Sequence, residues 1–480
     1  MRTAADLRSA TAAAAAALDA RFERALADLV AFARIPSISA AGFDPAQVAR
    51  SAEHAAALLV DVGLSGVEVL RLPGAHPAVY GEWRAARPDA PTVLLYAHHD
   101  VQPPGRLERW RTPPFEPTVR EDGRLYGRGV VDDKAGLVLH LAALRAWREA
   151  AGGPPVHVKL LVEGEEEIGS VHLADFLRAE RERLRADVLV LSDTANLATG
   201  LPSFTTSLRG LVVVDVEVRA LDHPLHSGMW GGPLPDAATA LCALLARLTD
   251  ADGAIAVPGL ADDAPELDAA ALAALAALPF DADGFRRDGG VPDAVPLSGE
   301  PGRSVYEQLW LRPALAVTAL EAMPLAEAGN QLIAEARARV GLRLAPGQDA
   351  ERAASRLAAF LRADPPRGVV VETRVESAAG GWRTEPVGPA FDAARRALRA
   401  GYGCDAVAIG CGGSIPFVGP FLAELGGAPA LLLGLEDPPC NAHGENESLH
   451  LGDFRKASLA ALHLLAELSG LSFPARAPDR

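Results

Sequence analysis

Five apolar segments, far apart in this chain, each run directly into side chains that bind metal ions. The segments read TVLLYAHHD, GRGVVDDK, VHVKLLVEGEEE, DVLVLSD and ALLLGLEDPPCNAH. In an open α/β sheet, ligands bind at the carboxyl ends of the strands, where the connecting loops converge. Two histidines and several carboxylates at that edge suit one or two divalent cations of the zinc type. Each motif alone is uninformative, but the set of five predicts a metal site.

The length and charge of the chain narrow the classes of protein to which it can belong. Its 480 residues exceed what one hydrophobic core organises, so we expect more than one domain. The formal net charge is −16 and no Lys/Arg-rich stripe is present, which argues against a nucleic-acid partner. The four cysteines are far apart and form no CxxC, a pattern typical of reduced thiols in the cytoplasm.

The N-terminal region contains an alanine-rich run at residues 11–17, but charged residues follow it at once. Apolar residues then continue at helical spacing through Leu26, Leu29 and Phe32, which predicts an amphipathic helix rather than a signal peptide. No apolar stretch is long enough to span a bilayer. We therefore expect a soluble cytoplasmic protein without a membrane partner.

The pattern of expected elements divides the chain into three blocks. Strands alternate with helices over residues 1–204 and again over 380–480, which predicts an α/β domain with a mostly parallel sheet flanked by helices. Residues 205–379 read differently, with strands at 334–344 and 368–375 and a helix between them, and predict a smaller α+β domain. Because His443 must return to the first sheet to join the other ligands, the second domain is expected to be inserted into the first.

The end of the first apolar segment contains two adjacent histidines. Neighbouring residues at a strand end point to opposite sides, so at most one of His98 and His99 is expected to face a metal. Asp100 points the same way as His98 and could hold the imidazole through its second nitrogen. The alternative interpretation is a strand-end turn with solvated polar residues.

Two acidic runs have similar alternatives. Glu165, Glu166 and Glu167 follow an apolar strand, and if they are buried their repulsion must be relieved by a cation or by a raised pKa. The glutamate with the raised pKa would be a natural general base. Asp132 or Asp133 could cap the helix that follows, while the other binds metal.

Other candidates also have structural interpretations. His226, in the inserted block, could be a surface histidine, and Arg343 could bind a carboxylate in a bidentate fork or face solvent. Gly413 and Ser414 follow a predicted strand and offer an anion cradle or a flexible turn. Cys440 could be a zinc thiolate, but the carboxylates already supply enough ligands.

Together these motifs resemble those of the M20 family of metallopeptidases, and in particular its carnosinase-like cytosolic dipeptidase branch. The resemblance runs from about Phe32 to Leu451 and rests on YAHHDVQP, WRTPPFEP, LYGRGVVDDKAG, LVEGEEEIGS, VLSDT and NAHGENE. It implies a zinc-peptidase-like catalytic domain, formed by residues 1–204 and 380–480, with an inserted lid or dimerisation domain at 205–379. It also implies two divalent metal ions per subunit, with zinc expected and manganese or cobalt as alternatives.

The resemblance further implies a role for individual residues. Glu166 would be the catalytic base, Asp100 would orient a ligand histidine, and His226 would reach into the site of the partner subunit of a homodimer. The peptide bond between Asp132 and Asp133 would be cis. The expected metal ligands are His98, Asp132, which would bridge the two ions, Glu167, Asp193 and His443. The expected substrate-binding residues are Asn330, Arg343, Gly413 and Ser414.

The chain departs from the family pattern at three positions. Ile333 stands where proline is usual, and His99 and Glu165 add polar groups near the site. The implied activity is hydrolysis of the amide bond of dipeptides or short peptides with a free C-terminal carboxylate. An N-acyl-amino-acid amidohydrolase of the same family is the alternative, although DVQP and WRTPPFEP favour the dipeptidase. A non-catalytic binding relative is a more remote alternative, because every ligand and the base are present.

Overall fold

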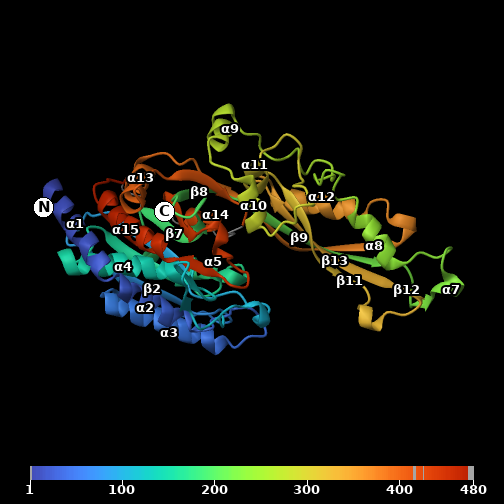
Figure 1. The fold of residues 1–480 in the computed structure, drawn as a ribbon, viewed down its shortest axis with the longest axis horizontal. Coiled ribbons are helices and arrows are strands. Elements are labelled where there is room, and N and C mark those ends of the chain that lie inside the picture. The colour runs from blue at the N-terminus through green and yellow to red at the C-terminus, as the bar shows by residue number, and fades with distance from the viewer. Residues whose placement is uncertain (1–2, 414–417, 425, 474–480) are drawn as a thin grey trace. The chain divides into compact units, whose positions relative to one another are not determined.

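A nine-stranded mixed sheet is the largest sheet of the structure, a computed structural model that describes residues 3–413, 418–424 and 426–473 (Figure 1). Its strand order is β1-β2-β6-β3-β7-β17-β8-β15, and β16 pairs with β8. At its centre β3 pairs in parallel with β6 and β7, and β7 pairs in parallel with β17. The strands are β1 (Ser65–Leu70), β2 (Ala78–Trp83), β3 (Thr92–His98), β6 (His157–Glu163), β7 (Val188–Ala195), β8 (Ser203–Leu208), β15 (Trp382–Arg383), β16 (Val407–Cys411) and β17 (Ala430–Glu436).

The chain divides into two units. The first contains residues 1–206, 385–409 and 417–480, and the second contains residues 207–384 and 410–416. The predicted fold class, an α/β fold with a mostly parallel mixed sheet flanked by helices, is confirmed. The role expected for residues 205–379, as a lid or dimerisation domain, stays a prediction.

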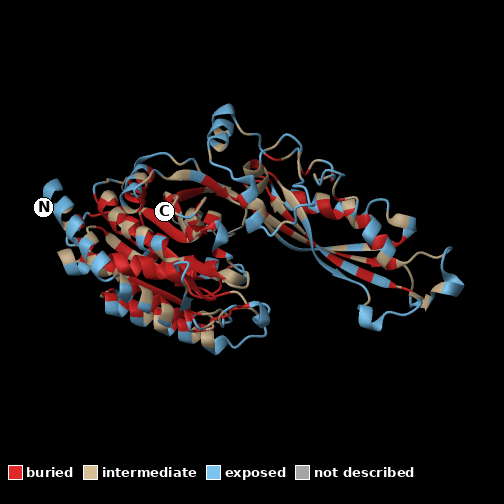
Figure 2. Cartoon of the chain, viewed as in Figure 1, coloured by how far each residue is buried: buried red, intermediate tan, exposed pale blue. Residues whose placement is uncertain are grey.

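Helices flank the sheet in the first unit, and their apolar faces form its core (Figure 2). α4 packs on β3 and against α1, α2 and α15. Trp147 of α4 is fully buried and donates its indole N–H to the carbonyl of Leu462, which fastens α4 to α15. The helices are α1 (Ala4–Ala20), α2 (Phe22–Ala33), α3 (Pro45–Val62), α4 (Lys134–Ala151), α5 (Leu173–Ala179), α6 (Arg181–Leu184), α13 (Pro389–Tyr402), α14 (Val418–Glu424) and α15 (Leu451–Leu468).

The start of α4 lies very close to β7. A Cβ atom at Gly136 would lie 2.6 Å from the carbonyl oxygen of Ser192, so a side chain there would push the helix away from the strand. The glycine of the DDKAG motif is therefore needed for packing. It lets the two aspartates at the helix start lie beside the end of β7.

Shorter elements surround this sheet. A three-stranded sheet of order β18-β5-β4 lies in the first unit, with β4 (Thr118–Val119), β5 (Arg124–Tyr126) and β18 (Ser448–His450). The 3₁₀ helices of the chain are η1 (Leu107–Arg109), η2 (Glu166–Ile168), η3 (Leu325–Glu327), η4 (Pro366–Gly368) and η5 (Pro438–Cys440). Among the described residues, no helix is both long and apolar enough to cross a bilayer.

The second unit is built on a four-stranded antiparallel sheet of order β11-β13-β9-β14. Buried and half-exposed residues alternate along β9, so one face of the sheet joins a core with α8 and α12 and the other carries ion pairs such as Arg339–Asp215. The strands are β9 (Gly210–Arg219), β10 (Leu225–His226), β11 (Ala314–Glu321), β12 (Gln331–Leu332), β13 (Glu335–Leu344) and β14 (Val370–Ala379). The helices are α7 (Ser227–Trp230), α8 (Ala237–Leu245), α9 (Ala269–Ala276), α10 (Ala282–Asp288), α11 (Val305–Trp310) and α12 (Ala350–Arg362).

Candidate metal centre

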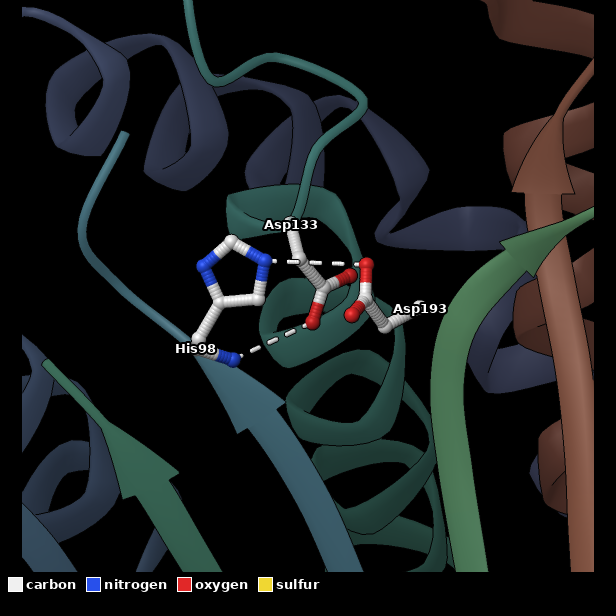
Figure 3. A group of neighbouring side chains, drawn as sticks. All are labelled: His98, Asp133 and Asp193. Atoms are coloured by element: carbon white, nitrogen blue, oxygen red, sulfur yellow. Dashed lines mark hydrogen bonds and ion pairs between the residues drawn. The ribbon is translucent and has the colours of Figure 1, made fainter. Parts of the chain in front are cut away.

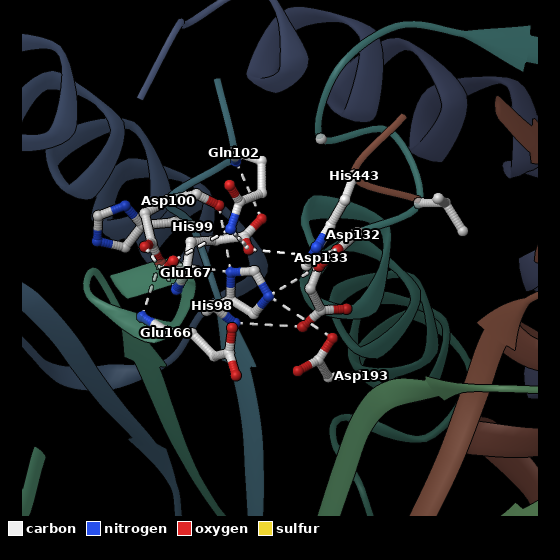
Figure 4. A network of polar contacts seen from close by, with 12 residues as sticks. His98, His99, Asp100, Gln102, Asp132, Asp133, Glu166, Glu167, Asp193 and His443 are labelled. Carbon is white, nitrogen blue, oxygen red and sulfur yellow. Dashed lines mark hydrogen bonds and ion pairs between the residues drawn. The ribbon is translucent and has the colours of Figure 1, made fainter. Parts of the chain in front are cut away.

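The polar ends of the apolar segments meet at one edge of the nine-stranded sheet (Figure 4). β3 ends at His98, β7 carries Asp193 near its end, and the turn after β6 presents the glutamates of η2. Parallel neighbours necessarily bring their carboxyl ends to the same edge, which is why segments far apart in sequence converge here. The start of α4 adds Asp132, and the loop after β17 adds His443.

Asp132 lies between the two histidines. Its Oδ1 is 3.0 Å from His98 Nε2, and its Oδ2 is 2.9 Å from His443 Nε2. The same two ring nitrogens also approach a second carboxylate each, with Asp193 Oδ1 at 3.6 Å from His98 and Glu167 Oε2 at 3.2 Å from His443. The five expected ligands are therefore brought together, and Asp132 has one oxygen facing each half of the cluster.

Three overlapping groups in this cluster have the geometry of a metal site. In each group the potential ligand atoms lie within 4.8 Å of one another. The groups are His98–Asp133–Asp193, shown in Figure 3, Asp132–Glu167–His443, and Asp132–Asp193–Glu436. Imidazole nitrogen and carboxylate oxygen are ligands that zinc, manganese and cobalt accept, so these side chains fit divalent cations.

The Asp132–Asp133 peptide bond is cis, as the resemblance implies. Asp133 accepts the backbone N–H of His98 through Oδ2 at 3.2 Å. Its Oδ1 is buried and has no hydrogen-bond partner among the residues that the structure describes. Asp133 occupies the N-cap position of α4 but its side chain makes no capping hydrogen bond, so the simple capping interpretation does not hold.

Asp100 connects His98 to the glutamate turn. It is fully buried, its Oδ1 lies 3.4 Å from His98 Nδ1, and it accepts the backbone N–H groups of Glu166 and Glu167 at 3.3 and 3.1 Å. Ser39 donates its hydroxyl to the same carboxylate at 2.7 Å. Burial alone would raise the pKa of Asp100, but the hydrogen bond and the charge of His98 outweigh burial and lower it. Asp100 therefore holds the imidazole and the turn in one network.

The glutamate turn is strongly perturbed electrostatically. Burial, followed by the charge of Asp193, raises the pKa of Glu166 well above its ordinary value. Burial and then Asp132 raise the pKa of Glu167 to about 7, while hydrogen bonds with Asp132 and Glu167 raise the pKa of His443 to about 11. Burial is the main cause for the two glutamates, and neighbouring carboxylates contribute to all three shifts. A divalent cation would neutralise the charge of these carboxylates.

The two polar departures from the family pattern point away from the ligands. Burial lowers the pKa of His99 to about 4, and its Nε2 lies 2.9 Å from the carbonyl oxygen of Pro77. Glu165 accepts the backbone N–H of His76 at 2.7 Å and contacts the ring of His172 at 2.9 Å. Both side chains therefore contact the segment at 76–77 and hold it beside the site. Neither is positioned as a metal ligand.

Two residues that sequence reasoning missed hold the ligands from outside. Gln102 donates its backbone N–H and its side-chain N–H to the carboxylate of Glu167 at 3.0 and 2.8 Å. Glu447 is fully buried, pairs with Arg128 at 2.7 Å, and accepts the backbone N–H of Asp132 at 3.3 Å. Gln102 lies in the DVQP motif and Glu447 in the NAHGENE motif. Their position beside expected ligands in these motifs could have identified them from the sequence.

Four of the remaining candidates lie in the second unit: His226, Asn330, Arg343 and Gly413. His226 of β10 is paired with Gln331 of β12, and the N–H of Ser227 donates to the carbonyl of Asn330, so His226 and Asn330 share one ribbon. Arg343 lies on β13, and the carbonyl of Gly413 accepts the N–H of Arg209.

The last two candidates are Ser414, expected to bind substrate, and Cys440, considered as a zinc ligand. Ser414 lies outside the described residues. Among the described residues, no group with metal-site geometry includes Cys440. Burial, followed by the charge of Glu436, raises the pKa of its thiol well above the ordinary value, which disfavours the thiolate that zinc would need.

Comparison with known proteins places these features in context. Residues 94–467 match the sequence profile of the family described as Peptidase family M20/M25/M40. The chain is 35% identical over 380 residues to a cysteinylglycine-S-conjugate dipeptidase of Corynebacterium striatum, covering 78% of this chain and 81% of that protein. It is 28% identical over 403 residues to the Cys-Gly metallodipeptidase dug1 of Schizosaccharomyces pombe, covering 82% and 83%. The crystal structure of human carnosine dipeptidase 1 superposes with a TM-score of 0.85 at 24% identity, covering 96% of this chain and 99% of that one.

Proposed function

This chain belongs to peptidase family M20/M25/M40, and we propose that it is a metal-dependent dipeptidase that cleaves dipeptides with a free C-terminal carboxylate. The predicted resemblance to the family is confirmed, and the enzyme is a hydrolase acting on peptide bonds. One observation supports the proposal most strongly. Asp132 lies with one oxygen against each of two histidines, and the half-buried Glu166 lies in the turn that also carries the proposed ligand Glu167.

We assign two ions to the cluster. His98, Asp132 and Asp193 would hold one, and Asp132, Glu167 and His443 would hold the other, with zinc as the expected ion and manganese or cobalt as alternatives. When bound, divalent ions supply Lewis acidity that polarises a carbonyl group and acidifies water. Asp100 would fix the orientation of His98 through the second ring nitrogen, as carboxylates beside ligand histidines do.

Glu166 would carry the proton during hydrolysis. Its carboxylate would take a proton from the attacking water, and the resulting acid would give that proton to the leaving nitrogen. The pKa of Glu166 is raised by burial, so its ability to accept a proton is increased. The hydrogen bond from its backbone N–H to Asp100 holds the turn from which this side chain projects.

The second unit would supply the remaining groups. We propose that His226 of the partner subunit in a homodimer stabilises the oxyanion, and that Asn330, Arg343, Gly413 and Ser414 bind the substrate. His226 is exposed on the β10–β12 ribbon, where a partner could receive it. We also propose a cytoplasmic location, since none of the four cysteines is joined in a disulfide.

A substrate panel tests this function. The metal-loaded protein is expected to hydrolyse dipeptides such as Cys-Gly or β-Ala-His and to leave N-acyl amino acids largely intact. For dipeptides, tripeptides and N-acyl amino acids alike, hydrolysis is measured by chromatography as release of the C-terminal amino acid. Preference for N-acyl amino acids would establish the deacylase alternative. Binding of dipeptides without turnover by the metal-loaded protein would establish a non-catalytic relative.

A further inference from the structure

The carboxylate of Glu436 lies beside the proposed metal ligands, but we have not assigned it as a ligand of either ion. Glu436 is the last residue of β17, and its carboxylate forms one of the three groups with Asp132 and Asp193, all within 4.8 Å of one another. It is half-buried.

The backbone holds this residue in place. Glu436 pairs with Ala195 of β7, and its carbonyl accepts the N–H of Asn196 at 2.7 Å. Its position at the strand end therefore keeps the side chain near Asp132 and Asp193.

The carboxylate of Glu436 lies mainly among acids. Within residues 3–413, 418–424 and 426–473 it forms no hydrogen bond or ion pair; it is grouped with Asp132 and Asp193, and only the more distant charge of His443 opposes theirs. Carboxylates held close together without donors are relieved by taking up a proton or by a positive partner. A cation bound beside Glu436 would keep its carboxylate ionised.

The metal ions are a poor match for that cation. In the assignment above each ion already has three protein ligands, and catalytic ions keep a coordination position open for water or substrate. A fourth protein ligand on the ion shared by Asp132 and Asp193 would close that position. A dipeptide brings a cation of its own, because its α-ammonium nitrogen is only two bonds from the scissile carbonyl carbon.

We propose that Glu436 receives the free α-ammonium group of the dipeptide and thereby determines the preference for an unblocked N-terminus. This inference rests on the proposed dipeptidase function. An N-acyl amino acid would leave the carboxylate of Glu436 without its cationic partner in the complex, and a site built for a polar partner rejects substrates that lack it. Glu436 would then separate the dipeptidase from the deacylase reading of the same metal centre.

The test compares two substrates that differ only in the ammonium group, Ala-Gly and N-propionylglycine, on wild type and Glu436→Gln. The expected result for Glu436→Gln is a fall in kcat/KM for Ala-Gly by about 10- to 100-fold, because a charge-assisted hydrogen bond is lost. The value for N-propionylglycine should stay within about twofold, and metal content by elemental analysis should be unchanged. Glu445→Gln is the matched control, since Glu445 lies in the loop after β17 but pairs with Arg106 at 3.1 Å. This control should keep the wild-type preference.

Two results would overturn the inference while leaving the dipeptidase intact. Equal loss on both substrates would show that Glu436 does not sense the ammonium group. Loss of a bound ion in Glu436→Gln would make it a metal ligand instead. If wild type prefers N-propionylglycine or hydrolyses no dipeptide at all, the proposed function itself fails, and the role of Glu436 fails with it.

Discussion

The Glu166→Gln variant is expected to keep its metal ions and to lose nearly all turnover. The amide has the shape of the carboxylate but cannot accept a proton from water, and loss of a general base costs at least about a hundredfold in rate. The backbone N–H of Glu166 is bound to Asp100, so the substitution should leave the turn in place. Turnover of a dipeptide and elemental analysis of the same preparation provide the two measurements.

The Glu165→Gln variant, which changes the neighbouring glutamate, is the comparison for this experiment. The carboxylate of Glu165 is already engaged by His76 and His172, so Glu165 has no free role as a base. Wild-type-like turnover in Glu166→Gln would contradict our assignment. If Glu165→Gln were then inactive, the base would be Glu165.

The His226→Ala variant is expected to fold, bind metal and dimerise, yet to lose about 10²- to 10³-fold in kcat, the usual cost of one oxyanion donor. The sharper test mixes this variant with Glu166→Gln. If His226 acts in the partner's site, each mixed dimer contains one site with Glu166 from one chain and His226 from the other. Activity should then return, up to half the sites of each mixed dimer.

Subunit exchange must be verified for this result to count. Two differently tagged variants, purified through both tags after mixing, isolate the mixed dimer. Activity in that fraction supports the role of His226 across the interface. A purified mixed dimer without activity would show that His226 acts within its own chain or not in catalysis.

The expected metal ligands could be predicted from the sequence more readily than the residues that hold them in place. Apolar runs that end in ligands predict parallel strands, and parallel strands must bring His98 and Asp193 to one edge. Gln102 and Glu447 could not be found in this way, because they act through hydrogen bonds to backbone and side-chain groups of residues distant in sequence. Glu436 ends the apolar strand β17, as His98 ends β3, yet the sequence interpretation of this segment considered only His443, seven residues later.

In the second unit, local sequence patterns predicted the secondary structure less completely. α8 begins at Ala237, because Asp236 caps it by accepting the N–H of Thr239. The strand expected at 368–375 lies at Val370–Ala379. β11 was not predicted, because ALAVTALE mixes alanine and leucine, which favour helices, with few β-branched residues. Its pairing with β13 decides its conformation.

The number of divalent ions held per chain is the decisive measurement for the proposed two-metal centre. The metal-free protein would be loaded with zinc, separated from excess metal by gel filtration and measured by elemental analysis against protein concentration. We predict two ions per chain, because Asp132 presents one oxygen to each half of a cluster whose carboxylates otherwise repel one another. One ion or none per chain would contradict the two-metal centre and the catalytic roles proposed around it.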